Sequence, residues 1–332
     1  MAKVCILGAG SWGTALASVL NDNKHDVVIW GRNREQVQQI NTNNTNSKYL
    51  PNVVLDKKIV ATNDLFEAIE NAELVVLAVP SQQIRNICVQ IKNIIQPWQI
   101  LVNVAKGMEN HSALRLSQVC KQQLPENSYS VLSGPSHAEE VVNRIPTVVV
   151  ASSSKMCIAD KVQDFFINEY FKVYTNHDLL GVEIGGAAKN IIAFGAGIAD
   201  GLGLGDNSKA ALMTRGMCEI KAFGVALGAE SETFAGLTGM GDLIVTCTSM
   251  HSRNRRAGIL IGKGHNVEQT QKEIGMVVEG IAATKVIYEM SQRIGVKMPI
   301  TEAIYKIIEG KITPEQAVAS LMRRLKRHEN DL

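Results

Sequence analysis

The feature that most constrains this chain is a glycine-rich turn between a short apolar run and a helix-forming segment, close to the N-terminus. Residues 4–7 predict a buried strand, Gly8, Gly10 and Gly13 follow in G-x-G-x-x-G spacing, and residues 14–20 favour a helix. In such a turn the first glycine makes the bend, the second lets the backbone approach a pyrophosphate, and the third allows close packing of helix and strand. The helix N-terminus adds N–H groups and a positive dipole end for the phosphates. A plain tight turn is the alternative, but strand, turn and helix in this order favour a dinucleotide-binding unit.

The end of the second expected strand, residues 26–30, bears on which dinucleotide is bound. A site for NAD usually has an acid there, which hydrogen-bonds the ribose hydroxyls. Here Arg32 and Arg34 occupy that place, and two guanidinium groups suit a 2′-phosphate, so we favour NADP(H) with NAD(H) as the alternative. Under the alternative, the arginines are solvated loop charges and Glu35 serves the ribose.

Strands alternate with helices through about residue 175, which predicts a doubly wound, mostly parallel sheet in a domain spanning residues 1–177. Residues 41–52 are rich in turn-forming side chains and predict an exposed loop. Ser136 and Glu139 have the spacing of a capping box, which predicts a helix that starts next to Ser136. The expected strands after the first two cover residues 57–62, 74–80, 100–105, 129–132, 147–150 and 171–174.

From residue 178 onward helical periodicity replaces strand patterns, so residues 178–332 predict an all-helical second domain. The stretch 178–200 is crowded with glycine and alanine, which implies close packing against other helices. Thr313, Pro314 and Gln316 predict the start of a last helix. The expected helices cover residues 178–200, 208–227, 254–261, 279–293, 300–309 and 314–327.

Composition excludes several classes of protein. A chain of 332 residues usually forms two domains, and a net charge of +2 gives no reason to expect nucleic acid as a partner. The basic segment 323–327 suits a helix C-terminus in water better than a DNA contact. No apolar run approaches the roughly 20 residues that a membrane span needs. The six cysteines are scattered without metal-ligand spacing, so no metal is expected. Together with an N-terminus that leaves no room for a signal peptide, this indicates a cytoplasmic protein.

Two lysines and one aspartate are candidates for chemistry. Lys106 follows a buried strand, where ligands of such sheets bind, although it could be an ordinary loop lysine. Lys189 lies in an otherwise apolar helix, where it either reaches solvent or sits in a dry site with a lowered pKa and acts as a general base. Asp242, between glycines and apolar residues, could orient a lysine or cap a helix over residues 243–248.

Ser252, Arg253 and Asn254 form the third candidate. Arginine beside serine and asparagine at an expected helix start is a good anion receptor, although a charged face in water is the alternative. Beside a reductase site, this receptor suggests a substrate that carries phosphate or carboxylate.

With these pieces assembled, the chain resembles the bacterial soluble NAD(P)-dependent glycerol-3-phosphate dehydrogenases nearly from end to end. The resemblance is specific because many motifs occur in the right order. They are Gly-Ala-Gly-Ser-Trp-Gly-Thr-Ala (8–15), Tyr-Leu-Pro (49–51), Ala-Lys-Gly (105–107), Ser-Gly-Pro-Ser-His-Ala (133–138), Ala-Ala-Lys-Asn (187–190), Gly-Leu-Thr-Gly-Met-Gly-Asp-Leu (236–243), Ser-Arg-Asn-Arg (252–255) and Val-Val-Glu-Gly (277–280). The spacer 248–251, which varies among relatives, is the one departure.

The resemblance implies a role for each matching residue and a 6-phosphogluconate dehydrogenase-like fold. It makes Lys189 the proton acceptor, supported by Asp242 and Thr246, with Lys106 in contact with both cofactor and substrate. Further substrate contacts would come from Gly134, Ser136, Ser252, Arg253 and Asn254. Further cofactor contacts would come from Ser11, Trp12, Arg32, Ala138, Arg253, Val277 and Glu279.

The implied reaction interconverts dihydroxyacetone phosphate and sn-glycerol 3-phosphate with NAD(P)H, and it supplies the backbone of phospholipids. The resemblance also implies a homodimer. A reductase of the ketopantoate or 6-phosphogluconate type is the alternative within enzymes. A redox sensor that binds NADPH without turnover is the alternative outside them, and it would need neither Lys106 nor Lys189.

Overall fold

A computed structural model of the chain describes residues 1–326, 328 and 329, which form two compact units. Unit 1 comprises residues 1–105 and 116–179, and unit 2 comprises residues 106–115 and 180–332. The division at 179/180 lies close to the expected boundary. The inclusion of residues 106–115 in unit 2 was not expected, and it transfers Lys106 from the first domain to the second.

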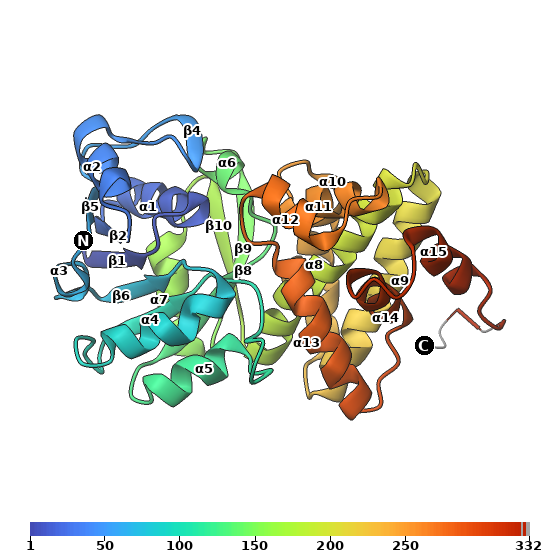
Figure 1. Ribbon diagram of the computed structural model, residues 1–332. Helices are drawn as coiled ribbons and strands as arrows, with labels where there is room; N and C mark the ends of the chain where they lie inside the picture. The colour runs from blue at the N-terminus through green and yellow to red at the C-terminus, as the bar shows by residue number, and fades with distance from the viewer. Residues whose placement is uncertain (327, 330–332) are drawn as a thin grey trace. The chain divides into compact units, whose positions relative to one another are not determined.

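Unit 1 is built on an eight-stranded sheet in the order β10-β9-β8-β7-β6-β1-β2-β5 (Figure 1). β1 (Lys3–Leu7) lies between β2 (Asp26–Trp30) and β6 (Leu74–Leu77), and all adjacent pairs are parallel except β8 with β9. The central strands are buried apolar segments, as parallel strands covered on both faces should be. The predicted doubly wound sheet is confirmed. The remaining strands are β5 (Val60–Thr62), β7 (Ile100–Asn103), β8 (Tyr129–Ser133), β9 (Thr147–Ser152) and β10 (Phe171–Asn176).

Helices cover both faces of this sheet, with α1 and α6 on one side and α4 and α5 on the other (Figure 1). The core between the layers is aliphatic, apart from Phe165, Phe166 and Phe171. The helices of unit 1 are α1 (Ser11–Asp22), α2 (Arg34–Asn43), α3 (Leu65–Ile69), the 3₁₀ turn η1 (Ser81–Gln83), α4 (Ile84–Ile91), α5 (Leu116–Gln123), α6 (Ala138–Val141) and α7 (Met156–Phe166).

Residues 41–52 are largely exposed, as predicted, but the prediction that they form a loop is wrong. α2 runs to Asn43, and β3 (Thr45–Asn46) pairs antiparallel with β4 (Leu50–Val54). Asn46 is buried, and its side-chain amide donates to the backbone oxygen of Ala9 and to the hydroxyl of Thr14. The asparagine-rich segment therefore contributes the Asn46 side chain, which hydrogen-bonds the glycine turn and the helix that follows it.

From residue 180 onward the described part of unit 2 is all-helical, whereas its segment 106–115 is irregular with one isolated β-bridge between Met108 and Arg115, and α8 (Leu179–Gly201) forms the core of the unit. α8 is long and apolar enough to cross a membrane, contrary to the expectation that no segment is, and 89% of its most apolar window is buried inside the protein. The other helices are α9 (Asp206–Ala226), η2 (Ser231–Ala235), the π-helical turn η3 (Leu237–Gly241), α10 (Asp242–Thr248), α11 (Arg253–Gly262), α12 (Val267–Ile274), α13 (Glu279–Arg293), α14 (Pro299–Ile308) and α15 (Pro314–Met322).

The glycines of α8 allow the close packing that the sequence predicted. A Cβ added at Gly197 would lie 2.0 Å from the backbone oxygen of Arg255, and one added at Gly258 would lie 2.0 Å from that of Phe194. The backbones of α8 and α11 therefore touch, which only residues without a side chain permit. This contact fixes α11 against the helix that carries Lys189.

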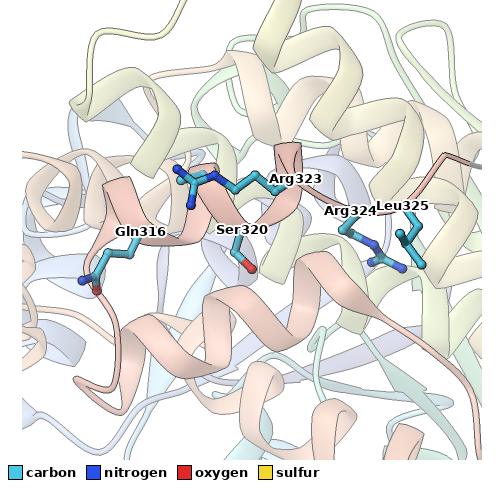
Figure 2. Close-up of a pocket in the computed structure, with 6 residues that line it drawn as sticks. Gln316, Ser320, Arg323, Arg324 and Leu325 are labelled. Atoms are coloured by element: carbon cyan, nitrogen blue, oxygen red, sulfur yellow. The ribbon is translucent and has the colours of Figure 1, made fainter.

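The last helix starts as predicted and ends earlier than predicted. Thr313 and Gln316 form a capping box at the start of α15, whereas the helix stops at Met322 and not at residue 327. The exposed Arg323 and Arg324 thus lie beyond its end, and Arg327 lies outside the described residues. Figure 2 shows the surface hollow lined by this segment, where the side chains of Arg323 and Arg324 point in opposite directions. The two arginines therefore do not converge on one anion.

Candidate active site

The glycine turn of unit 1 has the geometry that a pyrophosphate site needs. Gly8 has a φ of +131°, and a Cβ added at Gly13 would lie 2.1 Å from the backbone oxygen of Gly8. Gly10 has nothing within 4 Å of the place of its missing Cβ. Gly10 is also the N-cap of α1 and provides no side-chain cap, so N–H groups of the first turn remain available to a ligand. These residues fit a dinucleotide, with Ser11 and Trp12 in the first turn of the helix.

The end of β2 presents basic side chains, as predicted. Arg32 and Arg34 are exposed, and Arg34 is the first residue of α2, whose N-cap is Asn33. Glu35, the acid of the alternative interpretation, is also exposed in the first turn of α2. Both groups are available to a ligand, so the geometry leaves the choice between NADP(H) and NAD(H) open.

The segment after β8 differs from its predicted local structure. α6 starts at Ala138 with His137 as its N-cap and no side-chain cap, so the predicted capping box of Ser136 and Glu139 is wrong. Instead the hydroxyl of Ser136 donates to the backbone oxygen of Gly134, at 2.9 Å. Gly134 has a φ of +140°, which favours glycine. The segment therefore forms a tight turn before the helix starts.

Four side chains of unit 2 form a buried cluster around one carboxylate. Lys189 of α8 donates to Oδ1 of Asp242 and, at 2.6 Å, to the hydroxyl of Thr246. Lys106 donates to Oδ2 of the same aspartate at 2.7 Å. Lys189 is 4% exposed and Asp242 is 1% exposed, whereas the Lys106 side chain is 19% exposed. The interpretation of Lys189 as a lysine that reaches solvent is therefore wrong.

Burial and charge set the protonation of this cluster. Burial, with a smaller contribution from the nearby charge of Lys106, lowers the pKa of the Lys189 ammonium to about 8, because together they outweigh the opposing effect of the Asp242 carboxylate. Burial alone would raise the pKa of Asp242, but the charges of the two lysines and their hydrogen bonds hold it below its usual range. An ionised carboxylate thus lies beside a lysine that can exist in either protonation state near neutral pH.

The sequence around Asp242 and Gly185 brings the two charges together. The π-helical turn η3 leads directly into α10, which begins at Asp242 and has Gly241 as its N-cap. Contrary to the alternative interpretation, the carboxylate of Asp242 therefore does not cap α10. Gly185 lies one turn before Lys189, and a Cβ there would be 2.9 Å from the backbone oxygen of Thr238. This close approach of α8 to η3 places the lysine beside the aspartate.

Ser252 and its neighbours form the predicted helix start. The Ser252 hydroxyl accepts a hydrogen bond from the backbone N–H of Arg255 and so caps α11. Arg253 is exposed and donates to the backbone oxygen of Val277 at 3.2 Å. Among the residues that the structure describes, no carboxylate pairs with Arg253. An exposed arginine without an acidic partner can receive an anion.

Asn254 links the helix of Lys189, the start of α11 and the start of α13 through contacts that the sequence did not predict. Its amide donates to Asn190, which follows Lys189, at 2.9 Å, and its oxygen accepts from the backbone N–H of Gly280, also at 2.9 Å. Gly280 follows Glu279 at the start of α13. Asn190 appears in the motif 187–190, but no pattern in the sequence indicates a partner so far along the chain.

The described residues contain no group of three or more metal-binding side chains. The structure thus brings Lys106, Lys189, Asp242 and Thr246 into one cluster in unit 2 and links it to Asn254 through Asn190. The predicted cofactor residues Gly8, Gly10, Gly13, Arg32 and Arg34 lie in unit 1.

Comparison with known proteins gives the family. The model of the NAD-dependent glycerol-3-phosphate dehydrogenase N-terminus matches residues 3–159, and that of the C-terminus matches residues 178–319. A glycerol-3-phosphate dehydrogenase [NAD(P)+] of Clostridium perfringens (strain SM101 / Type A) is 55% identical, with 99% of each chain covered. A relative of the same name from Bacillus velezensis is 53% identical, with 99% of this chain and 96% of the relative covered.

A solved structure agrees with these sequence matches. The crystal structure of glycerol-3-phosphate dehydrogenase from Coxiella burnetii has a TM-score of 0.93 and 35% identity, and it covers 97% of this chain and 99% of that one. Family models and relatives agree over nearly the whole length, so the chain belongs to the NAD-dependent glycerol-3-phosphate dehydrogenase family.

Proposed function

We propose that this chain interconverts dihydroxyacetone phosphate and sn-glycerol 3-phosphate with NAD(P)H. The observation that carries the proposal is the buried cluster of Lys189, Asp242 and Lys106 in a member of this family. A ketone reductase needs a group that exchanges a proton with the alcohol oxygen, and a buried lysine with a pKa near 8 can do so in both directions.

Lys189 is the proposed proton donor and acceptor. The hydride at the central carbon of the substrate would be supplied or taken up by the nicotinamide when it is bound. During reduction the ammonium of Lys189 gives its proton to the ketone oxygen, which becomes the hydroxyl, and during oxidation the neutral amine takes that proton back. Lys106 stabilises the negative charge that develops on the same oxygen. Asp242 and Thr246 hold the ammonium of Lys189 in position.

The phosphate of the substrate is proposed to bind at the start of α11, on Ser252, Arg253 and Asn254. The exposure of Arg253 and the absence of an acidic partner for it among the described residues support this role. Two further substrate residues, Gly134 and Ser136, and the cofactor residues Ala138, Val277 and Glu279 are proposed from the resemblance alone.

The experiment that tests this function is a spectrophotometric assay of NADPH oxidation by the purified chain. Dihydroxyacetone phosphate should be reduced, ketopantoate and phosphorylated sugar acids should not react, and the reverse reaction should follow with sn-glycerol 3-phosphate. A chain that binds NADPH but oxidises it with none of these substrates would be the redox sensor of the alternative interpretation.

The glycine turn yields a prediction in which two neighbouring variants differ. Gly13→Ala should lower both Tm and NADPH affinity, because its Cβ would collide with the backbone at Gly8 and such overpacking costs about 1–3 kcal/mol. Gly10→Ala should leave Tm unchanged, because its Cβ meets open space, and should weaken NADPH binding alone. Thermal melts and fluorescence titration with NADPH measure the two effects. If Gly10→Ala binds NADPH normally, the pyrophosphate does not lie against this turn.

We propose NADP(H) as the preferred cofactor, with Arg32 and Arg34 on the 2′-phosphate. Arg32→Asp should then raise KM for NADPH about 10- to 100-fold, because a hydrogen bond to a charged group is worth about 1.5–3 kcal/mol. KM for NADH, which lacks that phosphate, should change little in the same variant and serves as its control. Equal KM values for NADPH in the variant and the wild type would instead favour Glu35 and NAD(H).

The cellular role also stays a proposal. We propose a cytoplasmic homodimer that supplies sn-glycerol 3-phosphate for phospholipid synthesis. Support for the compartment comes from the cysteines of the described residues, none of which forms a disulfide. Support for the dimer and for the lipid role comes from the family alone. Light scattering of the purified chain gives its mass directly, against 36.1 kDa for one chain.

A further inference from the structure

Three charged side chains outside the proposed reaction centre meet at the C-terminal end of α8. Oδ2 of Asp200 lies 2.7 Å from Nε of Arg255, and its Oδ1 lies 2.6 Å from Nζ of Lys209. The three side chains are between 13% and 17% exposed, so the group is largely shielded from water. Such shielded pairs hold a defined geometry better than solvated surface pairs do.

Arg255 joins three helices. Its Nη1 donates to the backbone oxygen of Thr248, at the end of α10, at 2.6 Å, while its Nε holds Asp200 of α8. Its backbone N–H donates to the hydroxyl of Ser252, and this bond caps α11. One residue thus ties the helix of Asp242 and Thr246, the helix of Lys189 and the start of the proposed phosphate site.

The segment between α10 and α11 is short and lies at the surface. The backbone N–H of His251 donates to the hydroxyl of Ser249 within this segment, and Met250 is 59% exposed. Two contacts also hold the first turn of α11 against α8: the backbone oxygen of Arg255 packs against Gly197, and the side-chain amide of Asn254 donates to Asn190. The side-chain bonds of Arg255 to Asp200 and Thr248 add the restraint that ties the end of α10, and so both ends of this segment, to α8.

We infer that Asp200 and Arg255 are positioning residues that hold Ser252 and Arg253 at the place where they bind the substrate phosphate, while Lys189 is held separately by Asp242. The inference rests on the proposed function, because it assigns a role to residues behind the proposed phosphate site. Arg255 is engaged by Asp200 and Thr248, so it acts through its neighbours and does not contact the phosphate.

The test uses Asp200→Asn with Lys209→Met as its matched control. Asp200→Asn keeps the size of the side chain and removes the charge that holds Arg255. It should raise KM for dihydroxyacetone phosphate roughly 10- to 100-fold, because small misplacements of binding groups cost about that much, with kcat and its pH profile nearly unchanged. Lys209→Met removes the other partner of the same carboxylate, on a helix without proposed site residues, and should leave KM unchanged.

A substrate without phosphate separates a positioning role from general damage. Dihydroxyacetone should be reduced slowly, at the same kcat/KM by the wild type and by Asp200→Asn, because it makes no phosphate contact. Arg255→Lys, which keeps the charge but cannot make both bonds, should fall between the wild type and Arg255→Gln in KM for the phosphorylated substrate. The double variant Asp200→Asn/Arg255→Gln should have a KM for dihydroxyacetone phosphate no higher than that of Arg255→Gln alone, because both changes break the same ion pair between Asp200 and Arg255.

Several results would overturn the inference. They are an unchanged KM in Asp200→Asn, an equal rise in KM in Lys209→Met, and an equal loss with dihydroxyacetone. A lower KM in Asp200→Asn would show that the released Arg255 binds the phosphate itself, which contradicts the positioning role. Failure of the wild type to reduce dihydroxyacetone phosphate at all would instead reject the proposed function, so the two failures are distinct.

Discussion

Replacing Lys189 by alanine is expected to lower kcat by about 100- to 10,000-fold, the usual contribution of a positioned acid or base. The ammonium is the only group for which we propose proton exchange with the substrate oxygen. NADPH affinity should remain that of the wild type, because the proposed pyrophosphate site lies in unit 1. Steady-state rates in both directions, with a fluorescence titration of NADPH, measure the two quantities.

The fold should survive this substitution. Asp242 keeps its ion pair with Lys106, so no unpaired charge is left in the interior. Lys189→Met is the matched control, because it fills the same volume without a proton to give, and it should lose as much activity as the alanine variant. Normal turnover in either variant would reject Lys189 as the proton donor, whereas loss of activity with a collapsed Tm would leave only a structural role.

Local sequence patterns predicted the parts of this protein that local chemistry determines. The glycine turn, the central strands and the capping box at Thr313 each depend on residues a few positions apart, and all have the expected structure. The close packing of α8 also followed from its glycines, although the sequence did not identify the partner. These features can be predicted because their cause lies within one helix, strand or turn.

Features that depend on a distant partner were wrong or missing. In the segment 41–52, where a loop was expected, β3 and β4 pair instead. The side chain of Asn46 bonds the backbone of the glycine turn, far away in the sequence. The capping box predicted at Ser136 was wrong for a local reason, because its hydroxyl bonds Gly134, only two residues away. For Lys189, burial decided between two interpretations that the sequence left open. That burial depends on the approach of Gly185 to η3, which follows much later in the chain.

The family resemblance joined candidate residues that physical reasoning had treated separately. Lys106, Lys189 and Asp242 lie in three separate parts of the sequence, and no spacing rule places them together. The structure then joins them and adds Asn190, whose partner Asn254 lies on another helix. The contribution of Arg255 was not visible in the sequence either, because its partners lie on two other helices.

Replacing Asp242 by asparagine should move the pH dependence of the reaction, not merely weaken it. Asp242 is the carboxylate that opposes the effect of burial on the pKa of Lys189, which lies at about 8. Without its charge, burial and the repulsion from Lys106 remain, and both lower the pKa of Lys189. The ammonium would then lose its proton at a lower pH than in the wild type.

The direction of the shift in pH dependence follows from the protonation state of Lys189 that each direction of the reaction needs. Reduction needs protonated Lys189, so kcat/KM for dihydroxyacetone phosphate should fall as pH rises through about 8 in the wild type and at lower pH in Asp242→Asn. Oxidation of sn-glycerol 3-phosphate needs the neutral amine of Lys189. The rise of its kcat/KM with pH should therefore also move to lower pH in Asp242→Asn. The variant should also be less stable, since removing one partner of a buried ion pair costs about 3–5 kcal/mol.

Asp206→Asn provides the matched control for this experiment. It removes the same charge from the same unit, but the Asp206 side chain is fully exposed and 3.9 Å from Lys209. Its pH profiles and Tm should therefore equal those of the wild type.

A lower plateau in Asp242→Asn with an unmoved midpoint would mean that this carboxylate orients Lys189 without setting its protonation. A midpoint that moves to lower pH in both directions of the reaction supports Lys189 as the group that titrates. It is the buried lysine of the cluster, and Thr246, the other donor to Oδ1 of Asp242 among the described contacts, carries no charge that could titrate.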